Sequence, residues 1–397
     1  MKSVGKGTVE ARRKGVWRLR VSVVYDDGTP ERLSKNVECR TKTEAKKLLD
    51  AWRAELLTST VDIRRTGLTL AEFLNEHIEY CRDVENLSPN TVRGYRDIVN
   101  TRFNGAIGNT PLVDLKPFMI EEHMAYLRKQ GGHNGRPLSG TSVQRAFSFL
   151  KTALKRAVML EYIPTNPCER VKPPKRNKTE ANFLTKEEVQ QIMFLLIGHP
   201  SPQFAMACRL ALATGMRRGE LCGLRWQDVD FDEQRIHVAH SLAEVKIDDD
   251  SNQKSLLLKD CKTDSSERWI ALDNMTAQWL KLHEAQQYYR LAYNGVEQTG
   301  DTPVCANDLG EWYRPSCCTS DFVAFRNQHG FDVRLHDTRH TQASLLIAAG
   351  EDIVTVSKRL GHSKVSTTLD IYSHLMPGKD RSAADKIGEI FAVPKVV

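Results

Sequence analysis

Six residues in the second half of the chain could together act on a phosphodiester. They are Arg217, Lys262, His336, Arg339, His362 and Tyr372. The two guanidinium groups suit a phosphate whose oxygens gain negative charge, because they bind such oxygens bidentately and keep their protons. Tyr372 offers a phenol nucleophile, which needs a cation or a proton acceptor nearby to react at neutral pH. Lys262 could donate a proton to the leaving oxygen, so the set predicts phosphoryl transfer.

The spacing of neighbouring residues adds supporting groups to this set. Glu220 follows Arg217 by three residues, so it could orient that guanidinium across one helical turn. His336, Arg339 and His340 have the i, i+3 and i+4 spacing of one helical face. His336 and His340 also match the spacing of a zinc-binding helix, but the glutamate and third ligand of such a site are missing. We therefore predict no metal site.

A helix-rich region must position these residues, and we predict a catalytic domain over 183–397. A capping box over 185–188 opens it, and short strand patterns at 235–238 and 268–272 predict a small antiparallel sheet. The acidic stretch 248–250 is interpreted as an exposed hairpin loop. After Tyr372, apolar residues recur at helical spacing and predict a C-terminal tail helix that needs a partner. They are Ala383, Ala384, Ile387, Ile390 and Phe391.

Residues 1–64 read as a separate small domain. Trp17 to Val23 alternates apolar and polar side chains, which is typical of a half-buried strand, with Arg18 and Arg20 on its polar face. A turn, a second strand over 31–39 and a capping box at 41–44 before a helical stripe complete a small sheet with one helix. The outward arginines could face a DNA groove.

Residues 65–170 predict an all-helical domain, followed by a basic linker over 171–182. The expected helices cover about 70–81, 88–103, 119–129 and 142–160. Prolines interrupt the linker, which is too polar for a core. Basic side chains of the last helix and the linker join the arginines of the first domain as DNA-binding candidates. They are Arg145, Lys151, Lys155, Lys175 and Arg176.

Charge and composition favour a soluble protein that binds a polyanion. The net charge is +7, and residues 1–180 account for +12 of it, which favours nucleic acid without separating DNA from RNA. No apolar stretch approaches a membrane span and no signal peptide begins the chain, so we expect a cytosolic protein. The nine cysteines contain no C-x-x-C pair and are interpreted as reduced thiols.

The six reactive residues, in this chain order, resemble the signature of the tyrosine recombinases, the phage-integrase family. The family pattern is Arg, Lys, His-x-x-Arg, His or Trp, and Tyr, and it is matched from Arg217 to Tyr372. Thr338 departs from it, because the family usually has an apolar residue there. Residues 65–170 resemble the family's SAM-like core-binding domain. Residues 1–64 resemble the small arm-binding domain, three strands and one helix, of integrases from conjugative transposons.

The resemblance implies a multidomain α+β protein that clamps double-stranded DNA at crossover and arm sites. It implies a 3′-phosphotyrosyl intermediate, strand exchange in a homotetramer, no cofactor, and integration and excision of a mobile element with an accessory protein. It also implies that the tail helix docks on a neighbouring protomer, and it places the protein in the bacterial cytosol, at the nucleoid. Two alternatives stay open: a type IB topoisomerase-like enzyme, and a DNA-binding regulator without catalysis.

Overall fold

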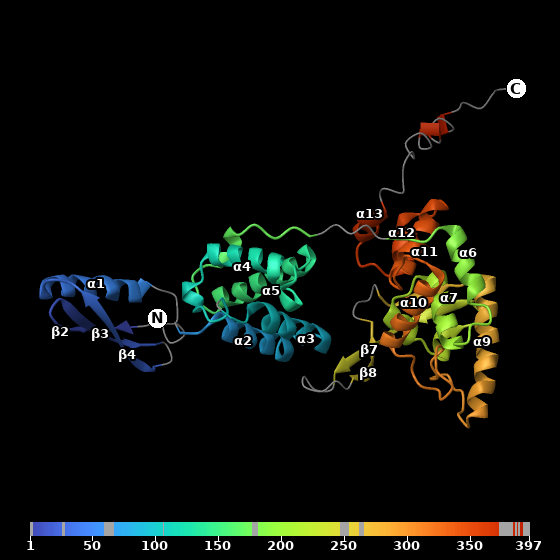
Figure 1. The fold of residues 1–397 in the computed structure, drawn as a ribbon, viewed down its shortest axis with the longest axis horizontal. Coiled ribbons are helices and arrows are strands. Elements are labelled where there is room, and N and C mark those ends of the chain that lie inside the picture. The colour runs from blue at the N-terminus through green and yellow to red at the C-terminus, as the bar shows by residue number, and fades with distance from the viewer. Residues whose placement is uncertain are drawn as a thin grey trace. The chain divides into compact units, whose positions relative to one another are not determined.

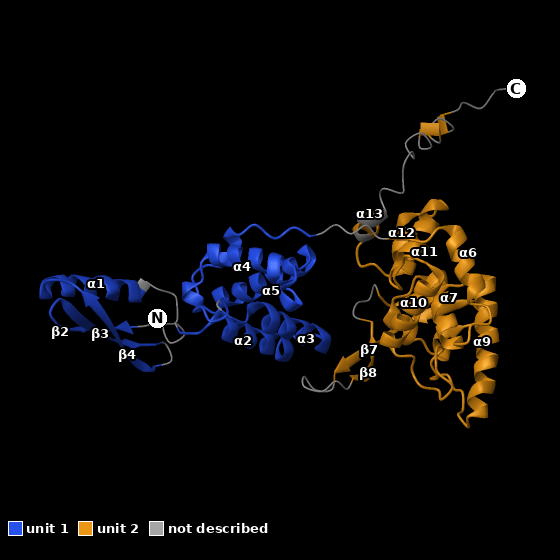
Figure 2. Ribbon diagram, in the orientation of Figure 1, with its two compact units in different colours: residues 1–178 blue, residues 179–397 orange. Residues whose placement is uncertain are grey.

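The structure, a computed structural model, divides into two compact units, residues 1–178 and 179–397 (Figure 2). The division falls inside the predicted linker 171–182, whereas the predicted boundary at 64/65 lies outside the described residues. Two N-terminal domains therefore stay a prediction. The described ranges are 3–25, 28–58, 67–105, 107–176, 182–246, 254–261 and 266–372, with 384, 385, 387, 390 and 391.

Unit 1 begins with an antiparallel sheet covered by one helix (Figure 1). Its central strand β3 (Val16–Val24) pairs along its length with β4 (Pro30–Glu38). On the other side β3 pairs with β2 (Thr8–Arg13) and, further along, with β1 (Ser3–Val4). The helix α1 (Lys42–Thr58) follows the sheet.

The sheet has four strands, where the resemblance to arm-binding domains implied three. The extra strand arises because the strand preceding β3 is interrupted at Gly5–Gly7, so β1 and β2 share one edge of β3. Gly7 has φ +70°, and a Cβ added there would lie 2.7 Å from the carbonyl oxygen of Arg20. A side chain at that position would be strained and would clash, so the chain breaks its pairing at a glycine.

The alternation along β3 confirms the predicted two faces of the sheet. Leu19 and Val21 are buried in one core with Ala45 and Leu49 of α1. Arg18 and Arg20 occupy the alternate positions, as the two-residue period of a strand requires. Arg18 donates to the side chain of Asn36, and Arg20 forms an ion pair with Glu10 at 3.2 Å.

The rest of unit 1 is helical, and its α-helices match the predicted segments within a few residues. The 88–103 segment departs from prediction in detail, because its helix α3 changes to a π-helical turn over Val99–Phe103. A capping box at Thr69 and Glu72 starts α2. The α-helices are α2 (Leu70–Asp83), α3 (Pro89–Ile98), α4 (Pro117–Gln130) and α5 (Gly140–Met159). Short 3-10 turns cover Leu112–Asp114, His133–Gly135 and Pro167–Arg170.

Unit 2 carries the reactive residues and is mainly helical (Figure 1). The predicted capping box is present, since Thr185 accepts from the Glu188 N–H and the Glu188 carboxylate accepts from the Thr185 N–H. The helices are α6 (Lys186–Leu195), α7 (Pro202–Thr214), α8 (Arg218–Cys222), α9 (Asn274–Tyr293), α10 (Pro315–His329), α11 (Asp337–Ala348), α12 (Ile353–Leu360) and α13 (Val365–Tyr372), with a 3-10 turn at Trp226–Asp228.

The strands of unit 2 form a small sheet and a separate hairpin. The sheet joins β5 (Val229–Asp230), β6 (Arg235–Val238) and β9 (Arg268–Ala271), two of which the sequence predicted. The strands of this hairpin, β7 (His240–Lys246) and β8 (Lys254–Asp260), were missed, because neither alternates cleanly between apolar and polar residues, although a hairpin loop was predicted at 248–250. The acidic stretch 248–250 falls between these strands and lies outside the described residues.

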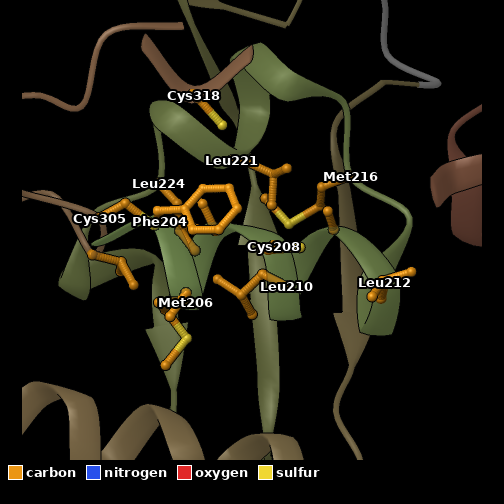
Figure 3. Packing of buried hydrophobic residues seen from close by; sticks show 14 of the residues in the cluster. Phe204, Met206, Cys208, Leu210, Leu212, Met216, Leu221, Leu224, Cys305 and Cys318 are labelled. Carbon is orange, nitrogen blue, oxygen red and sulfur yellow. The ribbon is translucent and has the colours of Figure 1, made fainter. Parts of the chain in front are cut away.

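The larger hydrophobic core of unit 2 has α7 buried along almost its whole length, and a smaller cluster joins α11 and α12. Phe204, Cys208 and Leu210 of α7 meet Leu221 of α8 and Cys318 of α10 there (Figure 3). This packing fixes the C-terminal end of α7, from which the first reactive arginine follows. Within the described part of the chain, no helix is long and apolar enough to cross a membrane.

Candidate active site

Arg217 lies at the junction of α7 and α8. Gly215 ends α7 with φ +66°, a left-handed turn that favours glycine, and Arg217 is the N-cap residue of α8. Its Nη1 and its backbone N–H donate to the Glu220 carboxylate at 2.7 and 2.9 Å. Its Nη2 donates to the carbonyl of Gly361 at 2.9 Å. The guanidinium is therefore oriented from two sides while its side chain stays 38% exposed.

Glu220 is the buried carboxylate that the i, i+3 spacing predicted. It is 3% exposed, and its second oxygen also accepts from Nη2 of Arg268 at 2.9 Å. Burial alone would raise the pKa of Glu220, but the charge of Arg268 and the hydrogen bonds from Arg268 and Arg217 hold it below its usual value. Glu220 therefore stays ionised between two arginines.

Arg339 enters the same site from α11 and is buried. Its Nη1 donates to the carbonyl of Gly215 at 2.7 Å, and its Nη2 donates to the carbonyl of Leu360. Leu360 and Gly361 are consecutive residues at the end of α12, where Gly361 has φ +67°. Arg217 and Arg339 thus bind adjacent carbonyl groups of one turn.

The histidines of the site lie near its arginines, with His336 exposed and His340 and His362 half-buried. His336 is the N-cap residue of α11, and its ring meets that of His340 at right angles, 5.4 Å between centroids. Burial and then the charge of Arg339 lower the pKa of His336. Burial and then His336 lower the pKa of His340. Both rings are therefore neutral at pH 7 before a ligand binds.

His362 directly follows the turn that holds the arginines. Its Nδ1 hydrogen-bonds the hydroxyl of Thr368 at 2.8 Å, which connects this turn to α13. Burial, followed by the charges of Arg339 and Arg217, lowers its pKa to about 4. The same two arginines also act on the pKa of His336. The structure therefore brings the four predicted residues Arg217, Arg339, His336 and His362 into one site.

The remaining two candidates are described less completely. Tyr372 is the last residue of α13, one helical turn after the buried Thr368, and its side chain lies outside the described part. Lys262 lies outside the described residues, between the end of β8 and the start of β9. Their roles stay predictions.

The candidate DNA contacts of unit 1 lie mostly on exposed positions. Arg145 and Lys155 are exposed on α5, and Lys175 is exposed in the segment after it. Lys151 is already engaged, because it forms an ion pair with Glu169 at 3.1 Å. Arg176 donates to the side chain of Gln144. These contacts leave the DNA-binding role of each residue a prediction.

The sequence missed two side chains that support the site. Arg268 holds Glu220, and Thr368 holds His362. Arg268 belongs to the Lys262–Arg268 cluster and begins a predicted strand, so its position beside the site could have been suspected. Thr368 precedes Tyr372 by four residues, the spacing of one helical face, which is the signal that could have found it.

Two family models match the chain. Residues 182–378 match the phage integrase family, and residues 109–173 match the phage integrase SAM-like domain. A tyrosine recombinase XerC-like protein of Caldanaerobacter subterraneus is 29% identical over 289 residues, which cover 70% of this chain and 72% of that protein. The ICEBs1 integrase of Bacillus subtilis is 26% identical over 393 residues, covering 96% of this chain and all (100%) of the relative.

Solved structures share the fold of this chain. The Tn1549 transposon integrase, solved with circular intermediate DNA, gives a TM-score of 0.67 at 19% identity, covering 80% of this chain and 99% of that one. A lambda integrase dimer bound to a core site gives a TM-score of 0.55 at 17% identity, covering 91% of this chain and 94% of that one. The mixed α+β fold is thereby confirmed. The family models match residues 109–173 and 182–378 and confirm the expected family. The chain therefore belongs to the phage integrase family of tyrosine recombinases, enzymes that cleave and rejoin DNA strands.

Proposed function

We propose that this chain is the integrase of a mobile element and joins itself to duplex DNA through Tyr372. The observation that carries the proposal is the shared turn at the end of α12, whose consecutive carbonyls accept from Arg339 and Arg217. Guanidinium groups held in this way are preorganised before DNA arrives. They would bind the non-bridging oxygens of the phosphate and stabilise the charge that these gain during displacement.

The proposed reaction forms a bond between the Tyr372 oxygen and phosphorus and breaks the bond from phosphorus to the 5′ oxygen. The products are a 3′-phosphotyrosyl link and a free 5′-hydroxyl. The phenol proton passes to His336, and Lys262 donates a proton to the leaving 5′ oxygen. We assign His336 as the acceptor because a pKa of about 4 makes His362 a weak base. Rejoining reverses these steps on a new 5′-hydroxyl.

The partners follow from the same proposal. Double-stranded DNA would bind at crossover sites across the basic helical region and at arm sites on the open face of the N-terminal sheet. The tail residues Ile390 and Phe391 are 74% and 73% exposed, which supports docking on a second protomer within a tetramer. The protein would work in the bacterial cytosol at the nucleoid, with an accessory protein for excision.

The test is cleavage of a nicked suicide duplex that carries candidate element ends. Wild-type protein should form a covalent adduct that survives denaturing electrophoresis. Tyr372→Phe should form none, because it lacks the attacking oxygen, yet it should bind the duplex as the wild type does. An adduct formed by the Phe variant would locate the nucleophile elsewhere. Relaxation of supercoiled plasmid by monomeric protein, without recombination, would favour the topoisomerase alternative.

A further inference from the structure

Arg268 connects three segments of the candidate active site. It is the first residue of β9, its side chain is 7% exposed, and all three guanidinium nitrogens donate hydrogen bonds. Nη2 donates to Glu220 at 2.9 Å, Nε to the carbonyl of Arg359 at 2.7 Å, and Nη1 to the carbonyl of Ser266 at 2.9 Å. One planar group therefore fixes three acceptors at once.

Each acceptor belongs to a segment that carries a reactive residue. Glu220 orients Arg217. Arg359 immediately precedes Leu360 and Gly361, whose carbonyls accept from Arg339 and Arg217. Ser266 lies four residues after Lys262 in the connection that leads into β9. Arg268 thus contacts the supports of the reactive groups, and it hydrogen-bonds none of the reactive side chains that the structure describes.

We propose that Arg268 is a positioning residue that sets the arginine pair and the turn before His362 in one arrangement. The inference rests on the proposed function, because it assigns Arg268 a part in the same cleavage. All three guanidinium nitrogens of Arg268 already donate to protein acceptors, so it affects the reaction step and leaves DNA affinity unchanged. A lysine in its place keeps the charge but loses the planar geometry that reaches three acceptors.

The charges around Glu220 give Arg268 a second, measurable effect. Arg268 and Arg217 both donate to this buried carboxylate, and the thiol of Cys261 is a further titratable neighbour. Burial raises the pKa of Glu220, and without Arg268 only Arg217 would lower it. The pKa of Glu220 should then rise. A protonated Glu220 accepts more weakly from Arg217 and loosens its orientation.

The kinetic experiment compares Arg268→Lys and Arg268→Met with Arg290→Met in the full-length protein. Arg290 of α9 is a matched control, because it forms an ion pair with the exposed Asp308. Single-turnover cleavage of the suicide duplex at saturating protein should slow by about 10- to 100-fold in both Arg268 variants, as for other residues that orient reactive groups. Duplex affinity should stay at the wild-type level, and Arg290→Met should cleave like the wild type. Wild-type cleavage by Arg268→Met would overturn the inference.

A double variant separates positioning from general damage. If Arg268 acts through Glu220, then Arg268→Met combined with Glu220→Gln should cleave about as slowly as the slower single variant. Multiplying losses would mean that the two residues act independently, which would overturn the inference. Melting curves check that each variant is folded, and Arg268→Lys carries the comparison should Arg268→Met unfold.

A measurement without DNA distinguishes this inference from the proposed function. NMR titration of the free protein follows the Glu220 carboxyl. Its pKa should be higher than in the wild type in Arg268→Met and unchanged in Arg290→Met. An unchanged pKa in Arg268→Met overturns the positioning role even if cleavage is slow. A raised pKa, in a protein whose wild-type form makes no adduct with any duplex, rejects the proposed function and leaves the support of Glu220 by Arg268 standing.

Discussion

Arg217 and Arg339 reach one site because their acceptors are neighbours in the chain. The carbonyls of Leu360 and Gly361 lie at the C-terminal end of α12, and each accepts a hydrogen bond from one guanidinium. A helix C-terminus leaves its last carbonyls without intrahelical partners, so it suits this use. The two cations would repel each other without Glu220 and the negative end of the α12 dipole. The proposed phosphate site is thus built before DNA binds.

The variant Arg217→Lys should cleave the suicide duplex at least about 100-fold more slowly than the wild type, as when other transition-state donors are removed. The lysine keeps the charge but cannot hold Glu220, Gly361 and a phosphate together. The measurement is the single-turnover rate at saturating protein. Arg218→Lys is the control, since Arg218 bonds Thr319 of α10 instead. Equal cleavage rates for Arg217→Lys and wild type would show that the guanidinium of Arg217 takes no part in the reaction.

His362 predicts an acid sensitivity of unit 2. Its pKa is about 4 in the folded protein and near 6.5 in the unfolded chain, so the unfolded chain binds the proton more readily between these values. The unfolding free energy should therefore fall as pH falls through this window. Melting temperatures of the DNA-free protein at pH 7 and pH 5 test this, above the range where carboxylates titrate. His362→Gln should show a smaller drop, and identical drops would contradict the shift.

Among the elements of the chain, the N-terminal sheet with its helix is the part that we expect to fold and bind DNA independently. Its core consists of residues from β3, α1 and their neighbours, and its polar face carries Arg18 and Arg20. The helical region has its own core of residues from α2 to α5. Separate cores allow separate folding, since each buries its own apolar faces.

Removing the sheet should therefore spare the chemistry. A protein that starts at Thr66 should cleave the suicide duplex at the wild-type rate and lose affinity for a distinct arm sequence. Electrophoretic mobility shifts with arm and crossover duplexes measure both affinities. Arg18→Ala combined with Arg20→Ala in the full chain is the milder version, and it should weaken arm binding alone. Loss of cleavage by the folded truncated protein would contradict the modular interpretation.

For the whole molecule, we expect the tail after α13 to link each active site to assembly in the proposed tetramer. Residues 384, 385, 387, 390 and 391 are helical and exposed, so this chain's own domain leaves them uncovered. Burying Ile387, Ile390 and Phe391 on a neighbour would contribute roughly 1.5 to 3 kcal/mol for each side chain if fully covered. That is enough to couple occupancy of one site to the next.

Deleting residues 383–397 should weaken assembly on DNA and leave single-site binding nearly intact. Light scattering or native mass measurements of DNA complexes, compared between full-length and truncated protein, give the result. Ile390→Ser with Phe391→Ser should behave like the deletion. Tetramers of equal stability in both proteins would reject docking of the tail.

Short-range features of this protein could be predicted from its sequence. The helices, the faces of β3, the capping box at Thr185 and the contact of Glu220 with Arg217 all depend on residues a few positions apart. Such features follow from backbone periods that hold whatever the rest of the chain does. The chain order of the reactive residues added the family, which the comparisons confirmed.

Tertiary structure alone decided how these segments meet. The contacts of Arg217 with Gly361, Arg339 with Gly215 and Arg268 with Arg359 join segments that are far apart in the chain. Backbone carbonyls have the same chemistry at every residue, so no side-chain pattern marks the ones that will accept. The depressed pKa of His362 likewise arises from burial and from arginines of other elements. The sequence determines which groups are present, and packing of the core of unit 2 determines which of them touch.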